Sequence, residues 1–220
     1  MGTYLGFTVR NKYIAYCAIR NTSISKIGIL QLNSANIHGD IATTCQLLRV
    51  KLLDSTVLTA IESKLNRANQ LDKAIERCRI ATILECQVNQ TFNTKTQQID
   101  PVQVRKSVSN AYKIKIISRE DLHNFVAKNI PSFPILDKPE FNQGLSDAWA
   151  ISYYLSSQQR KQQMMNDPKT IERLGNRLEN DRIIATIRRS IGLETDEQVI
   201  TNLNQIIESR RQKLFDKWLS

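Results

Sequence analysis

Hydrophobic residues recur with two different periods along this chain, and the change of period predicts the order of its elements. Three short runs rich in β-branched and aromatic residues come first, at residues 3–9, 13–20 and 25–32. Short polar segments separate these runs, a pattern typical of an antiparallel meander. The N-terminal part of the chain therefore predicts three consecutive strands.

The period lengthens to threes and fours over residues 54–77, which predicts an amphipathic helix with Asp54-Ser55 as its cap. Residues 79–86, RIATILEC, form a continuous apolar, β-branched run. Such a run after a helix predicts a central strand that is buried on both faces. A second helix is expected within residues 94–112. It either starts at Asp100-Pro101, because proline is tolerated in a first turn, or begins earlier and kinks there.

Residues 112–118, YKIKIIS, alternate polar and apolar side chains and predict a fifth strand. Residues 120–128 predict a short helix, the proline-rich segment 129–144 a loop, and residues 145–156 an apolar helix. With right-handed crossovers, strands four and five lie parallel to strand one. The order therefore predicts an α/β domain over residues 1–156, an RNase H-like mixed five-stranded sheet with flanking helices, although other folds share this order.

Residues 157–220 predict a C-terminal helical extension. One amphipathic helix is expected over residues 168–191, where Gly192 ends it, and Thr195-x-x-Gln198 matches a capping box for a final helix. The two helices can pair with each other, with the domain or with another protein. Because amphipathic helices suit docking surfaces, a protein partner bound through this extension is one expectation.

The charge of the chain favours a polyanionic partner. Lysine and arginine number 31 against 21 acidic residues, a net charge of +10, and phosphates release counterions to such side chains. Arg10 and Lys12 lie in the expected first hairpin turn, and Arg105 and Lys106 lie on the expected second helix. These pairs predict contacts with a nucleic-acid backbone without sequence readout, although each pair alone is more often a solvated face.

The four cysteines, Cys17, Cys45, Cys78 and Cys86, form no CxxC pair, and with only two histidines they argue against a structural zinc site. Cys17, Cys78 and Cys86 lie within or beside apolar stretches and predict buried free thiols. Free thiols fit an intracellular, reducing compartment (cytoplasm, nucleus, organelle matrix, viral factory or virion) rather than secretion. No stretch approaches the about 20 apolar residues of a membrane span, and the first residues lack the basic-then-apolar pattern expected of a signal peptide.

Three stretches of the chain resemble motifs of the RuvC-type Holliday junction resolvases, most of all their poxviral and mitochondrial branch. YLGFTVRNKYIAYCAI resembles the first hairpin, in which an Asp and a Gly precede a basic-Asn pair, here Arg10-Asn11. ILECQVNQ resembles the strand-four motif, in which a Glu precedes a polar residue and a Gln. GLSDAWAISYYL resembles the last helix, in which two Asp lie three residues apart. The resemblance spans about residues 3–156 and implies a homodimer that cleaves branched DNA with Mg²⁺.

The site residues of that family transfer unevenly onto this chain. Glu85 matches the strand-four Glu, Gln87 the Gln that follows it in contact with DNA, and Asp147 the second Asp of the last helix. The strand-one Asp falls on Gly6 and the first helix Asp on Gly144. Two Mg²⁺ ions held about 4 Å apart need several oxygen ligands, so Glu85 and Asp147 are expected to be a remnant catalytic and metal site.

Three functions stay open from the sequence. The first is a RuvC-like protein that binds branched or duplex nucleic acid and has lost most or all of its cleavage activity. The second is an active Mg²⁺-dependent, structure-specific endodeoxyribonuclease. The third is an assembly subunit of a nucleoprotein or virus particle, built on an inactivated RNase H-like fold. The substitutions at Gly6 and Gly144 favour the first and the third.

Overall fold

The structure is a computed structural model, and it describes residues 2–52, 56–62, 71–167, 169, 209, 212 and 213. The chain divides into two compact units, residues 1–157 and 158–220. The two helices expected after residue 168 fall almost wholly outside the described residues, so they stay predictions.

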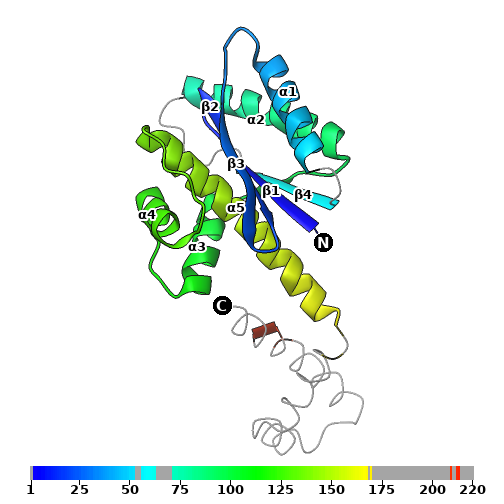
Figure 1. The fold of residues 1–220 in the computed structure, drawn as a ribbon, viewed down its shortest axis with the longest axis vertical. Helices are drawn as coiled ribbons and strands as arrows, with labels where there is room; N and C mark the ends of the chain where they lie inside the picture. The colour runs from blue at the N-terminus through cyan, green and yellow to red at the C-terminus, as the bar shows by residue number, and fades with distance from the viewer. Residues whose placement is uncertain are drawn as a thin grey trace, which may run out of the picture. The chain divides into compact units, whose positions relative to one another are not determined.

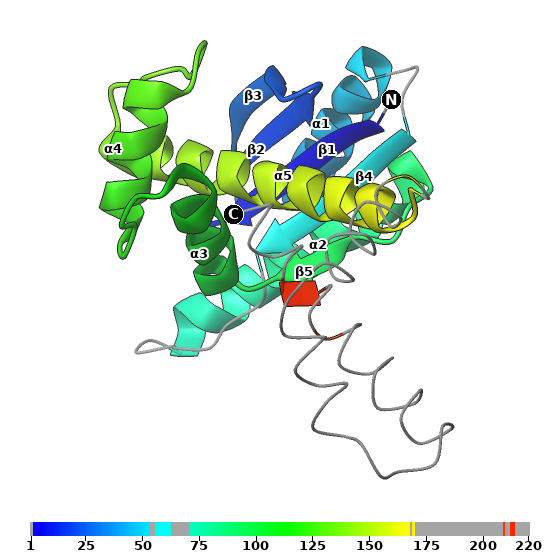
Figure 2. The same ribbon diagram turned by 90° about the horizontal axis from the view of Figure 1, so that it is seen from below.

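Five strands of the first unit form one mixed sheet in the order β3-β2-β1-β4-β5. Figure 1 labels β1 to β4, and Figure 2 labels all five strands. The meander consists of β1 (Gly2–Val9), β2 (Tyr13–Arg20) and β3 (Ser23–Gln31), paired antiparallel. On the other side of β1, β4 (Thr56–Glu62) pairs parallel with β1, and β5 (Gln97–Ile99) pairs parallel with β4. The predicted meander and the predicted mixed five-stranded α/β sheet are confirmed.

Helices cover both faces of this sheet. The buried residues of α1 (Ile37–Lys51) and α2 (Leu71–Phe92) pack with one face in a single apolar cluster. Those of α3 (Pro101–Tyr112), α4 (Arg119–Asn129) and α5 (Pro139–Met165) pack with the opposite face. Figure 2 shows α5 crossing the sheet on the face away from α1. Because the strands are covered on both sides, a side chain at a strand end can be buried next to a helix.

Two of the predicted elements have the wrong type. Residues 56–62, expected within a helix, form β4, and residues 79–86, expected as a strand, lie inside α2. The apolar residues Ile80, Leu84 and Val88 recur every four positions and are buried against the sheet. That spacing is a helical stripe, so the β-branched composition of RIATILEC gave a misleading signal.

The predicted fifth strand at residues 112–118 is also wrong. Ile116 is buried while its neighbours Lys115 and Ile117 are exposed, so the alternation of burial is present without any strand pairing. The fifth strand of the sheet is β5, and a helix that the pattern did not predict, α1, follows the meander. The resulting order places a helix before each of the two parallel strands, β4 and β5.

The remaining helices of the first unit begin where local chemistry favours a start. Asp100 accepts a hydrogen bond from the amide of Val102 at 2.9 Å, and Pro101 opens α3 as predicted. Ser118 forms a capping box at the start of α4, which confirms the short helix predicted there. α5 begins at Pro139, so the last residues of the expected loop 129–144 belong to this helix.

All four cysteines are free. The prediction of a buried thiol holds for Cys17 and is wrong for Cys86, which is exposed on α2. None of the helices in the described part of the chain is long and apolar enough to cross a membrane.

Candidate functional site

Four charged side chains meet at the end of the sheet where β1 and β4 both finish. Arg10 follows the last residue of β1, and Glu62 is the last residue of β4. Because these strands are parallel, their carboxyl ends lie at the same edge of the sheet. Asp147 reaches this edge from α5, and Arg119 reaches it as the first residue of α4. These four residues are called the charge cluster below.

Each carboxylate of the charge cluster contacts both guanidinium groups. Arg10 donates from Nη1 to Glu62 Oε2 at 2.6 Å and from Nη2 to Asp147 Oδ2 at 2.9 Å. Arg119 donates from Nη2 to Glu62 Oε1 at 2.9 Å, and its Nε lies 3.2 Å from Asp147 Oδ2. The four side chains therefore form a closed ring of alternating charge that links β1, β4, α4 and α5.

Three of the four side chains are nearly withdrawn from water. The exposed fractions are 13% for Arg10, 14% for Glu62 and 9% for Asp147, against 39% for Arg119. Arg10 Nη1 also donates to the carbonyl of Val9 at 2.7 Å. A buried charge is tolerated only when it is paired and hydrogen-bonded, and here two positive and two negative groups balance.

Burial also shapes the proton affinity of the ring. It raises the pKa of Asp147 to about 6, and the charges of Arg119 and Arg10 oppose this rise while that of Glu62 adds to it. For Arg10, burial opposes the charged form, but Glu62 and Asp147 outweigh it and raise the pKa of the guanidinium. Asp147 is therefore mostly ionised at neutral pH and takes up a proton as the pH falls through about 6.

A pH titration tests this coupling within the ring. Replacing Glu62 by Gln is expected to lower the pKa of Asp147, because Glu62 raises that pKa by charge repulsion. The measurement is the midpoint of the Asp147 carboxyl ¹³C shift in NMR, starting from about 6 in the unaltered protein. Glu76→Gln on α2 is the control and leaves the midpoint in place. An Asp147 midpoint that does not move in Glu62→Gln contradicts the coupling.

Gly6, the position matched to the strand-one Asp, has no room for a side chain. A Cβ at Gly6 would lie 2.6 Å from the carbonyl oxygen of Ala148 and 2.7 Å from Ser152 Oγ, both on α5. The Gly6 amide donates to that Ser152 hydroxyl at 2.8 Å. α5 thus lies directly on this part of β1, and a carboxylate at position 6 requires the helix to move.

The strand-one side chain that lies level with Glu62 is Thr8. Phe7 pairs with Ile61 in the parallel register, so Thr8 follows beside Glu62. Side chains alternate along a strand, and Thr8 faces the same layer as Gly6, the side of α5. Thr8 is buried, and its hydroxyl has no hydrogen-bond partner among the residues that the structure describes. By this register, Thr8 is the strand-one residue next to Glu62 on the α5 side of the sheet, whereas Gly6, the position matched to the family Asp, lies two residues earlier.

The structure separates the two residues expected as a remnant metal site. Asp147 belongs to the charge cluster, but Glu85 lies on α2, where it accepts a hydrogen bond from Gln98 Nε2 at 3.1 Å. The expectation that Glu85 ends the fourth strand is wrong, because that carboxylate is Glu62. Gln87 also lies on α2, and its Nε2 donates to Thr91 Oγ1 at 3.2 Å.

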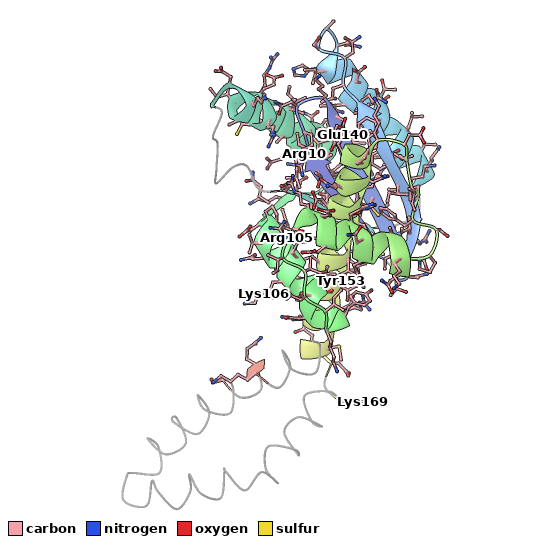
Figure 3. All side chains as sticks on the ribbon, turned by 90° about the vertical axis from the view of Figure 1, so that its left-hand side faces the viewer. Arg10, Arg105, Lys106, Glu140, Tyr153 and Lys169 are labelled. Atoms are coloured by element: carbon pink, nitrogen blue, oxygen red, sulfur yellow. The ribbon has the colours of Figure 1, made fainter. Side chains whose placement is uncertain are left out.

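The basic residues and Asn11, all expected to contact nucleic acid, differ in how far they are engaged within the domain. Arg10 is engaged inside the charge cluster, and Asn11 Oδ1 accepts a hydrogen bond from Arg77 Nε at 2.8 Å. Lys12 and Lys106 are exposed, and Arg105 is partly buried on α3, where its charge opposes the rise in the pKa of Asp147. Figure 3 shows Arg10 beside the first turns of α5, with Arg105 and Lys106 on α3 on the same side of the domain.

Two members of the charge cluster, Glu62 and Arg119, were not expected from the sequence. Glu62 carried a usable signal, because it ends the short apolar run TVLTAIE and a carboxylate there needs a partner. Arg119 carried a weaker one, since it directly follows Ser118, the cap of α4. Nothing in the sequence alone indicated that this arginine meets β4 and α5.

The charge cluster does not fit a two-Mg²⁺ centre. The oxygens of Glu62 and Asp147 that face the cluster already accept hydrogen bonds from two guanidiniums. Gly144, matched to the first helix Asp, packs against the ring of Tyr13. Within residues 2–52, 56–62 and 71–167, no three His, Cys, Asp or Glu side chains are grouped so that they could hold a metal ion. The described residues therefore do not offer the set of free carboxylates that two metal ions would need.

Comparison with solved structures identifies the fold. A structure titled T. thermophilus RuvC in complex with Holliday junction substrate matches with a TM-score of 0.51, over 71% of this chain and 96% of that chain. The fold is RuvC-like. The sequence identity in this match is 10%, so the likeness extends to the fold alone.

A second structure, titled Thermus thermophilus RuvC structure, matches with a TM-score of 0.49 at 11% identity, over 70% of this chain and 95% of that chain. No protein-family model matches the chain, and no curated protein sequence matches it. The resemblance drawn from three sequence motifs is confirmed at the level of a RuvC-like fold.

Proposed function

We propose that this protein binds branched or duplex nucleic acid through its RuvC-like domain and does not cleave it. The observation that carries the proposal is the charge cluster, in which two arginines occupy the carboxylates that a nuclease needs for metal ions. Support for binding comes from the solved RuvC with a similar fold, which is in complex with a Holliday junction. The net charge of +10 adds a sequence-independent attraction for phosphates.

The charge cluster also changes what binding requires. In a site made of carboxylates alone, the negative charge repels DNA until cations arrive. Here Glu62 and Asp147 are neutralised by Arg10 and Arg119, and Arg105 lies close enough to affect Asp147. The five side chains together carry one positive charge, so phosphates are attracted without any added metal ion.

A binding and cleavage assay tests the proposal. We expect the same dissociation constant for a four-way junction in EDTA and in Mg²⁺ at matched ionic strength, tighter binding than to a linear duplex of equal length, and no nicking with Mg²⁺ or Mn²⁺. Equal affinities for junction and duplex would reject selectivity for branched DNA. Metal-dependent nicking that Glu62→Gln or Glu85→Gln abolishes would establish the alternative, an active resolvase that uses Mg²⁺.

Two exposed lysines provide a test of backbone contact. Lys12→Ala and Lys106→Ala are each expected to weaken binding and to reduce the slope of log affinity against log salt by about 1, because each removes one phosphate contact. Lys51→Ala is the control, since Lys51 is exposed on α1, which covers the opposite face of the sheet. A salt slope that stays the same in both test variants contradicts contact through these residues.

The assembly subunit remains a second candidate because of the amphipathic pattern after residue 168. It predicts a stable protein partner, or a second copy in a homodimer, held through the C-terminal extension. A protein that ends at residue 167 and still assembles normally counts against this candidate.

A further inference from the structure

The two carboxylates of the charge cluster surround Arg10 as oxygen ligands surround a cation. Three oxygens from three places in the chain approach its terminal nitrogens: Glu62 Oε2 at 2.6 Å, Val9 O at 2.7 Å and Asp147 Oδ2 at 2.9 Å. All three are hard oxygen donors, the type that Mg²⁺ and Mn²⁺ prefer. The guanidinium is therefore enclosed by oxygen atoms that could also serve as ligands of a divalent cation.

Arg119 completes the charge balance from outside. It contacts the other oxygen of Glu62 at 2.9 Å and shares Asp147 Oδ2 with Arg10, while 39% of its side chain is exposed. Together the two guanidiniums supply two positive charges, which equals one divalent cation. The buried hydroxyl of Thr8, which follows the Phe7–Ile61 pair beside Glu62, is one more oxygen, and it has no partner in the described part of the chain.

We propose that Arg10 and Arg119 take the structural place of the divalent cation between Glu62 and Asp147, so that removing both arginines converts the charge cluster into a divalent-cation site. This inference rests on the proposed function and gives the physical reason for it. The site does not fit a metal ion because the guanidinium groups of Arg10 and Arg119 already supply its positive charge as part of the chain. An arginine cannot dissociate, so β1, β4, α4 and α5 stay joined at this edge of the sheet whatever the metal concentration.

Charge decides which variant opens the site. Removing Arg10 alone leaves the ring with one net negative charge, and removing Arg10 and Arg119 leaves two. Two negative charges around a set of oxygen donors match one Mn²⁺ ion, whereas the intact ring is neutral. Serine is the substitution of choice, because it is small and uncharged and leaves space for hydrated metal.

The experiment is a titration of the full-length protein with Mn²⁺ alone, followed by the electron paramagnetic resonance signal of the free ion. Four proteins are compared: the unaltered chain, Arg10→Ser/Arg119→Ser, the same pair combined with Glu62→Gln/Asp147→Asn, and a control pair, Arg20→Ser/Arg79→Ser, at two exposed arginines. We expect only the Arg10/Arg119 pair to bind Mn²⁺, with an affinity at least about tenfold above the others.

The outcomes separate cleanly. A folded Arg10→Ser/Arg119→Ser protein that does not bind Mn²⁺ overturns the inference, and so does an unaltered protein that binds Mn²⁺ through Glu62. If the pair unfolds the protein, the titration is followed by circular dichroism: recovery of the fold by Mn²⁺ supports the inference, because a ligand that binds only the native state stabilises it, and no recovery overturns it. Cleavage of junction DNA by the unaltered protein would count against the proposed function, a result distinct from any of these.

Discussion

Replacing Arg10 by methionine is expected to lower the free energy of unfolding by about 3–5 kcal/mol at pH 8, the usual cost of breaking a buried ion pair from one side. Methionine preserves much of the apolar stem but leaves Glu62 and Asp147 with only Arg119, which is 39% exposed. The loss comes from two carboxylates that remain buried with half of their compensating charge gone. The measurement is chemical denaturation followed by circular dichroism.

This loss should shrink in mild acid. The pKa of Asp147 is about 6 in the folded protein, which is above its value in the unfolded protein. At a pH between these two values, Asp147 is protonated in the folded state but ionised in the unfolded state. Stability tied to Asp147 is therefore present at the acid end of this window and falls as the pH rises through about 6. Arg10 lowers this pKa, so its removal raises the pKa further. The difference between Arg10→Met and the unaltered protein is expected to be smaller at pH 5 than at pH 8.

Arg20→Met serves as the matched control, because Arg20 is exposed at the end of β2 and is expected to change stability by no more than about 0.5 kcal/mol. A loss of similar size in both variants, or a loss in Arg10→Met that is constant from pH 5 to 8, argues against a buried ring of charge. The comparison separates the role of the cluster from a general effect of losing an arginine.

The parts of the fold that sequence predicted well are those with long or capped patterns. The strand runs of the meander are rich in β-formers and are separated by short polar turns, and Asp100-Pro101 fixes the start of α3. β4 was taken for helix because its apolar positions, Val57, Leu58 and Ile61, fit a spacing of threes and fours as well as a strand. Seven residues are too few for periodicity to choose between them. Pairing with β1 decides, and that contact is not local in sequence.

The same difficulty explains what was missed at the site. Once RIATILEC was interpreted as the fourth strand, Glu85 became the expected carboxylate and Glu62 was hidden within a supposed helix. Asp147 was found because it matches the second Asp of the last-helix motif, GLSDAWAISYYL, and that stretch does lie in a helix, α5. Its two ion-pair partners are distant in sequence: Arg10 lies 137 residues before Asp147 and Arg119 lies 28 residues before it. The tertiary fold brings them together. A local sequence pattern cannot predict contacts between residues this far apart in the chain.

Replacing Gly6 by alanine is expected to cost about 3 kcal/mol or more of unfolding free energy, at the upper end of the range for overpacked cores. A single methyl group there would meet the carbonyl oxygen of Ala148 at 2.6 Å and the backbone nitrogen of Ser152 at 2.8 Å. Both are backbone atoms of α5, so relief requires the helix to shift as a body. Gly6→Asp adds a buried charge and is expected to be worse still, so it does not restore a nuclease site.

Gly28 provides the matched control for this prediction, because a Cβ there would also come close to another atom, at 2.5 Å. That atom is the hydroxyl oxygen of Tyr16, the far end of a side chain that can swing aside. Gly28→Ala is therefore expected to cost less than about 1 kcal/mol in the same denaturation experiment. Equal losses for the two alanine variants would mean that α5 does not lie on β1 as closely as the structure has it. A much larger loss at Gly6 would show that strand one has no room for a side chain at position 6, and therefore none for a carboxylate.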